Sequence, residues 1–166
     1  MAGESYIEDV IFDVRDYIQA NVGGFIAAIN AAKNDGLTVA NFREFEVDDG
    51  DPLSRTVLPS MLIDPTDVVE KALTMGEDEL QVTLIVVMVH VGDRQARLPL
   101  IALRSAEALR RMILADVTFG GAVGGLQTAS DGSELLRFTY YPRVPGDMDR
   151  KVTTLRLTVV KDIPRE

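Results

Sequence analysis

One apolar run in the chain reads LQVTLIVVMVHV and extends from Leu80 to Val91. A strand with one face in water alternates apolar and polar residues. In this run both alternating sets are apolar, with Leu84, Val86 and Met88 on one side and Ile85, Val87 and Val89 on the other. The sequence therefore predicts a strand that is covered on both faces. Helices of the chain can cover one face, and the other needs a second layer or a neighbouring subunit.

Two further segments have the apolar spacing of amphipathic helices. In the first, one stripe is formed by Ile7, Val10, Ile11, Val14 and Ile18. The glycine pair at 23–24 is expected to break or bend this helix, and a second helical pattern follows over 25–32. In the other segment, over 102–116, the stripe is formed by Ala102, Ala106, Leu109 and Ile113.

Strand signals fill much of the remaining chain. A short strand is expected at 42–47, and the segment EFEVDDGDP (44–52) is expected to form an acidic loop. RTVLPSMLID (55–64) predicts a strand in which Pro59 indicates an edge position or a bulge. The pair Asp64-Pro65 is expected to end that strand, and residues 66–79 are expected to form a turn with a short helix.

The last third of the chain predicts antiparallel strands. Apolar residues alternate with polar ones at Leu136, Phe138 and Tyr140, and again at Leu155, Leu157 and Val159. A turn signal, Pro145-Gly146-Asp147, separates the two patterns. The whole order predicts one α+β domain over residues 1–166, with an antiparallel β-sheet and helices packed on one face.

Composition narrows the possible classes of protein. The chain has 166 residues, of which 46% are hydrophobic and 26% are charged, as in a globular domain. It has no cysteine, which excludes disulfides and thiolate metal sites. The acidic N-terminal segment is unlike a signal peptide, and the apolar runs are too short to span a membrane. We therefore expect no membrane association and a cytoplasmic site of synthesis.

Charge is distributed unevenly along the chain. The net charge is −9, with 17 acidic and 5 basic residues in 1–92 but 9 acidic and 12 basic residues in 93–166. An acidic chain is poorly suited to binding a phosphate backbone, which depends on Lys and Arg. The asymmetry fits solvated faces, and it also fits contact between an acidic surface of one copy and a basic surface of another.

Motifs for catalysis or ligand binding are weak. His90 is the only histidine and lies in the apolar run, where a packed histidine is favoured over a base that lacks a positioned partner. Asp48, Asp49 and Asp51 lack the order of a calcium loop. The glycines of TFGGAVGG (118–125) match no phosphate-binding motif and indicate a connection that needs positive φ. We expect no catalytic residue, no cofactor and no metal site.

Read in order, several segments resemble the tail-terminator and tail-completion proteins of long-tailed bacteriophages. They are the acidic helix YIEDVIFDVRDYI, the strand TVLPSMLID, the long apolar strand, and the helix that leads into ALRRMILADVTFGGAVGG. DVTFGG, between a helix and a strand, is the closest local match, and the strands FTYYPRV and KVTTLRLTVV complete the order. The likeness covers most of the chain and depends on the order of elements and on loose patterns.

This resemblance implies a structural protein rather than an enzyme. Six copies would form a ring that caps the tail tube, ends its polymerisation and prepares the head–tail joint. The implied partners are other copies of the chain, the tail-tube protein and a head connector, with DNA only as passing cargo. The implied location is the tail or neck of the virion, after assembly in the host cytoplasm.

The resemblance also suggests which residues make contacts. The candidates for subunit packing are Ile85, Val87 and Val89. The candidates for axial contacts are two loops, the acidic one with Asp48, Asp49 and Asp51 and the glycine-rich one with Phe119, Gly120 and Gly121. Three alternatives stay open: a neck protein that connects head and tail, a small-ligand-binding or enzymatic α+β domain, and an oligomeric adaptor unrelated to phage.

Overall fold

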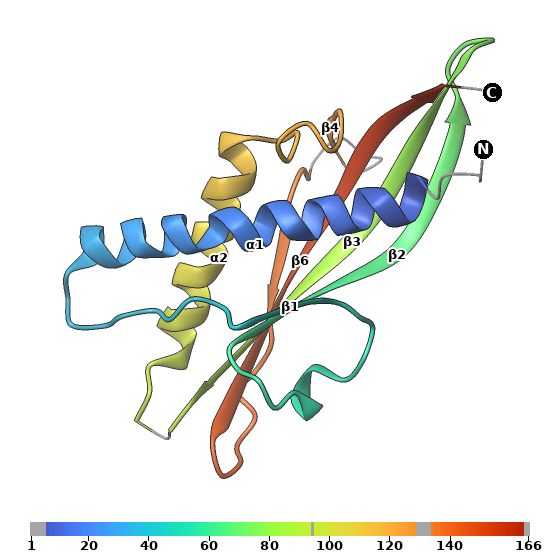
Figure 1. Ribbon diagram of the computed structural model, residues 1–166. Coiled ribbons are helices and arrows are strands. Elements are labelled where there is room, and N and C mark those ends of the chain that lie inside the picture. Colours follow the sequence, from blue (N-terminus) through green and yellow to red (C-terminus); the bar gives the residue numbers. More distant parts are fainter. Residues whose placement is uncertain (1–5, 94, 129–133, 165–166) are drawn as a thin grey trace.

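A computed structural model describes residues 6–93, 95–128 and 134–164 of the chain (Figure 1). Two long helices and six strands make up the described part, together with one short 3₁₀ turn. In chain order they are α1 (Tyr6–Lys33), β1 (Glu44–Val47), η1 (Pro52–Ser54), β2 (Ser60–Ala72), β3 (Glu77–Gly92), α2 (Leu98–Ala115), β4 (Gly125–Gln127), β5 (Arg137–Tyr140) and β6 (Asp149–Pro164).

The six strands form one sheet in the order β1-β2-β3-β6-β4, and β5 pairs with β6 beside β4. Strand β3 is central and pairs along its whole length with β6, from Glu77 opposite Pro164 to Gly92 opposite Asp149. All the pairings are antiparallel except that of β1 with β2, which is parallel. The α+β prediction is confirmed, and the expected antiparallel sheet is a mixed sheet because of this one edge strand.

Both helices lie on the same face of the sheet, as predicted (Figure 1). α1 buries a stripe that includes Val10, Val14 and Ile18, none of which is exposed. On the sheet, the even-numbered apolar residues of β3 face this stripe and belong to the same core. Burial of each such side chain contributes roughly 1.5–3 kcal/mol, so this layer supplies most of the stability of the fold.

The glycine pair does not break the first helix. α1 is continuous from Tyr6 to Lys33, which corrects the expected break or bend at 23–24. Turns on both sides are anchored, because Val22 and Ile26 are buried and the Asn30 side chain bonds the backbone of Val39 in both directions at 2.9 Å. Two glycines cost about 2 kcal/mol in a helix, less than these anchors contribute.

Strand β2 does not end at Asp64-Pro65 but continues to Ala72 and turns directly into β3. The expected turn with a short helix over 66–79 is therefore wrong. Pairing with β3 supplies the backbone of this segment with hydrogen bonds, whereas a short isolated helix is marginal in water. Pro65 is tolerated because β1 covers β2 only at Ser60–Ile63 and because a register shift follows at Pro65/Asp67.

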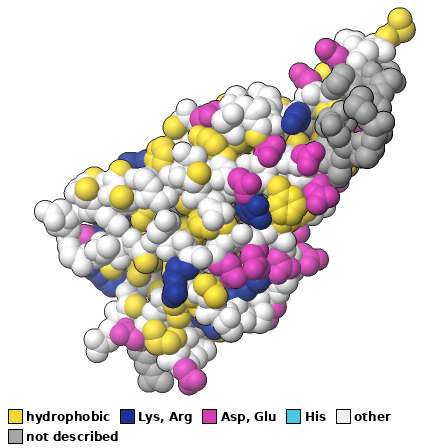
Figure 2. Space-filling view, viewed as in Figure 1, with side chains coloured by type: hydrophobic (Ala, Val, Ile, Leu, Met, Phe, Trp, Pro, Cys, Tyr) yellow, Lys and Arg dark blue, Asp and Glu magenta, His cyan; other side chains and the backbone are white. Residues whose placement is uncertain are grey.

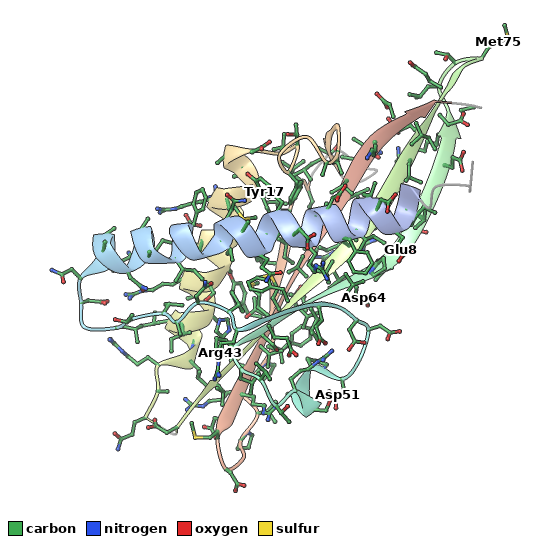
Figure 3. All side chains as sticks on the ribbon, in the orientation of Figure 1. Glu8, Tyr17, Arg43, Asp51, Asp64 and Met75 are labelled. Atoms are coloured by element: carbon green, nitrogen blue, oxygen red, sulfur yellow. The ribbon has the colours of Figure 1, made fainter. Side chains whose placement is uncertain are left out.

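The outer parts of β2, β3 and β6 form an arm that extends beyond the helical layer (Figure 1). The arm comprises residues 66–79 and 162–164 and ends in a turn at Leu73–Gly76. Met75 lies at its tip (Figure 3) and is 99% exposed. The long apolar strand therefore belongs to two regions, a packed body and a projecting arm.

The two adjacent glycines of α1 give a matched test of the helix. A Cβ at Gly24 would meet nothing within 4 Å, whereas a Cβ at Gly23 would lie 2.6 Å from the side-chain nitrogen of Asn41. Gly24→Ala is expected to stabilise the protein by about 1 kcal/mol and to raise the melting temperature by roughly 2–4 °C. Gly23→Ala should give a smaller gain or a loss. Thermal unfolding followed by circular dichroism measures both, and equal gains would contradict the contact with Asn41.

Candidate functional site

The face of the sheet opposite the helices, here called the second face, is closed at one end by the chain itself. The connection from β1 to β2 (48–59) crosses this end and carries the short turn η1. The guanidinium of Arg150 on β6 donates to the carbonyl oxygens of Leu53 and Arg55 at 2.5 and 2.7 Å. Beneath this crossover, Val89 and Leu62 are 0% and 1% exposed. Val89 is therefore a core residue, and its expected place in a subunit interface is wrong.

The acidic loop, which forms part of this crossover, is held by its own hydrogen bonds. Arg55 bridges Glu46 at 2.6 Å and also pairs with Asp48. The backbone nitrogen of Gly50, with help from Arg55, lowers the pKa of Asp48. Asp51 accepts a bond from the nitrogen of Leu53 at 2.9 Å and so caps η1 (Figure 3). Asp48 and Asp51 thus have local structural roles, whereas Asp49 is exposed and stays a candidate for contact.

Farther along the strands, the second face is open. Ile85 and Val87 lie there half-buried, with no helix over them, and both stay candidates for subunit packing. Next to them is a groove of about 470 Å³ between the sheet and the segment that leads into β5. Its walls are mostly polar and include Lys71, Gln81, Thr83, Arg137, Arg156 and Thr158. The hydroxyls of Thr83 and Thr158 are 2.9 Å apart across β3 and β6.

Sequence reasoning missed the arginines of this groove. Arg137 on β5 and Arg156 on β6 stand directly opposite each other in the antiparallel pairing. Like charges in such a pair repel. Both alternation patterns were visible in the sequence, but the pairing of β5 with β6 brings the two positions together, and no local signal gives that register.

The glycine-rich loop after α2 is organised by Asp116. Its carboxylate accepts bonds from the backbone nitrogens of Thr118 and Gly120 and from the Thr118 hydroxyl, and these bonds lower its pKa. Gly120 and Gly121 have φ values of +70° and +87°, as the predicted connection requires, and both are exposed. They stay candidates for contact.

Phe119 differs from its glycine neighbours because it is only 2% exposed. Its ring packs edge-on against Tyr17 of α1, with the ring centroids 5.7 Å apart. The expectation that Phe119 contributes to an exposed contact loop is therefore wrong. An aromatic residue that precedes two glycines carries no sequence signal that distinguishes a buried anchor from a surface contact.

His90 has the environment of a packed residue. Its Nε2 lies 2.9 Å from the hydroxyl of Ser105 on α2, and its ring is 5.3 Å from that of Phe42. Burial lowers the pKa of His90 to about 4, which keeps the imidazole neutral. His90 lines neither the hollow around Arg137 and Arg156 nor the one around Val144 and Met148. The geometry supports a structural role for this residue and offers no route for a substrate.

Within residues 6–93, 95–128 and 134–164, no three His, Asp or Glu side chains are placed so that they could share a metal ion. In the same part of the chain, no helix combines the length and the apolar character needed to cross a membrane. A comparison with models of known protein families gives no match, and a search among curated proteins gives none. The function of this chain is therefore inferred from its own surfaces.

The buried His90 predicts a pH dependence of stability. The unfolded chain binds a proton at this residue near pH 6.5, and the folded chain does so only near pH 4. Between these values the unfolded state holds more protons, so the free energy of unfolding falls as the pH falls. From about pH 7.5 to about pH 5 the native protein should lose about 2 kcal/mol more than His90→Gln. Urea unfolding at both pH values measures this, and equal losses would show that His90 is not buried and neutral.

Substitutions of Val87 and Val89 test which part of the second face is buried within the monomer. Val89→Glu places a charge beneath the crossover and should destabilise the protein by more than about 4 kcal/mol. Val87→Glu changes a half-buried position on the open part and should cost about 1 kcal/mol. Circular dichroism and urea unfolding of purified variants separate the two. If Val87→Glu also unfolds the chain, Val87 is part of the monomer core.

Proposed function

We propose that this protein is a structural subunit that closes the end of a phage tail tube as a homo-oligomeric ring. In this role it stops polymerisation of the tube and prepares the end for the head connector. The proposal joins the resemblance of the chain to tail-terminator proteins with the surfaces described above. The observation that carries it is the open part of the second face, where Ile85 and Val87 lie half-buried and neither described helix packs.

The arm supports the same proposal. It extends beyond the helical layer, and beyond Ile63 the outer edge of β2 pairs with no other described strand (Figure 1). Such a projecting ribbon gives a small protein additional reach toward a neighbour. Apolar side chains are exposed along it, among them Val68, Val69, Leu73 and Met75. Exposed apolar groups at one end of a molecule are typical of a surface that is covered in an assembly.

The distribution of acidic residues fits passage of DNA. Figure 2 shows acidic side chains gathered on the arm side of the helical face. Glu8 of α1 lies on this side (Figure 3). If this side faces the lumen of the ring, repulsion keeps the phosphate backbone from adhering to it. DNA is then passing cargo, and the binding partners are other copies of the chain, the tail-tube protein and the connector.

A small-ligand or enzymatic role has less support. Ligand pockets are usually lined by apolar side chains with a few polar groups that converge. The groove of the second face is open and polar, and His90 does not contribute to it. A neck protein would present similar surfaces, and the experiment below distinguishes it from a terminator.

The experiment adds the purified protein to its cognate tail-tube protein during tube assembly in vitro. We expect shorter tubes with a ring at one end in negative-stain images, because a capped end accepts no further subunits. Val87→Glu is the matched control, since it should fold but fail to cap. Tubes that grow to full length despite a ring at the end would identify a neck protein. Tubes with no ring at either end would contradict both roles.

A further inference from the structure

The crossover and the strands next to it form an acidic flank of the sheet. Its carboxylates come from β1, from the start of the crossover and from β2, and they are Glu44, Glu46, Asp48, Asp49, Asp51 and Asp64. In the described ion pairs, only Arg55 neutralises members of this set, namely Glu46 and Asp48. The flank therefore has a large excess of negative charge.

Two carboxyl groups of this flank have raised pKa values, because they are partly buried and lie near other negative charges. Burial, Glu46 and Asp48 together raise the pKa of Glu44 in spite of Arg55. Burial raises the pKa of Asp64, and the charges of Asp49 and Asp48 add to that effect. Cations placed against this flank would stabilise the ionised forms of both carboxyls.

The groove of the second face forms the opposite, basic flank. Arg137 and Arg156 face each other directly, and Lys71 lies on the same groove. The carboxylate of Glu134 is 3.9 Å from Arg137, and both side chains are well exposed. Arg156 makes no ion pair with any described residue, and Asp67 is the other carboxylate of the groove. A carboxylate between the two arginines would remove their repulsion and provide strong charged hydrogen bonds.

The carboxylates of β1 cannot reach Arg137 on β5 of the same molecule. β1 is the outermost strand on one side of the sheet, and β5 pairs only with β6 on the other side. Four strand spacings, about 19 Å, separate β1 from β5, whereas Asp64 on β2 lies only two strands from Arg156, with Ile85 of β3 between them. Complementary surfaces on opposite sides of one chain favour a head-to-tail contact between copies, and such contacts close into rings when the rotation allows it.

We infer that the acidic flank of one copy docks against the basic groove of a second copy, side by side around the ring. Carboxylates of the crossover face Arg137 and Arg156 of the neighbour, and the partner of this surface is another copy of the same chain. The inference rests on the proposed ring and assigns its lateral contact. It leaves the contact with the tail tube to other surfaces.

A charge-swap experiment tests this contact. Variant A is Arg137→Glu with Arg156→Glu, and variant B is Glu44→Lys with Asp49→Lys and Asp64→Lys, three acidic residues that have no ion pair in the described structure. Each variant alone opposes like charges and should assemble about 100-fold more weakly than the native chain. An equal mixture restores opposite charges at every contact, so it should assemble with A and B in alternation. Native mass spectrometry of the full chains measures both the size and the ratio.

A control keeps the test specific. Lys33→Glu with Lys161→Glu makes the same change in net charge at two basic residues outside the groove and should assemble almost like the native chain. Thermal unfolding checks that every variant is folded.

Four outcomes would overturn the inference: assembly of variant A alone at the native level, a mixture that stays dissociated, a control that dissociates as strongly as variant A, or a native chain that is monomeric at every concentration. In the first and last cases the tube-capping result still decides the proposed function independently.

Discussion

The structure depends on the pairing of β3 with β6 along its whole length on one side and with β2 over Asp78–Val89 on the other. This pairing fixes the register of sixteen residues of β3 against β6 and divides the apolar residues of β3 between two faces. One set closes the core beneath α1 and α2. The other set must be covered separately, and the chain covers only part of it with the crossover. The uncovered part of the second face and the projecting arm both result from the length of β3.

Much of the fold follows from periodicity in the sequence. The stripe of α1, the stripe of α2 and the two-faced character of β3 were all predictable, because burial selects apolar residues at helical or alternating positions. The arm was not predictable in the same way. Its segment contains Glu70, Lys71 and Ala72, which favour a helix locally, and pairing with β3 overrides that preference. In α1 the opposite happens: the glycine pair disfavours a helix locally, but tertiary contacts on both sides of the pair keep the helix continuous.

The candidate surfaces were predictable only in part. Ile85 and Val87 could be chosen from alternation alone, but Val89 could not be separated from them, because the crossover that buries it comes from a distant part of the sequence. The same limit applies to Phe119, which Tyr17 holds in the core. The opposed arginines of β5 and β6 depend on register between strands, which the sequence does not encode locally.

The central claim is that the open part of the second face is covered by other copies of the chain. Sedimentation velocity of the purified native protein over a wide concentration range, with images of the same samples, tests it most directly. The account predicts a closed species of about six protomers that grows at the expense of monomer as concentration rises. A protein that stays monomeric throughout, both alone and with the tail-tube protein, would contradict it.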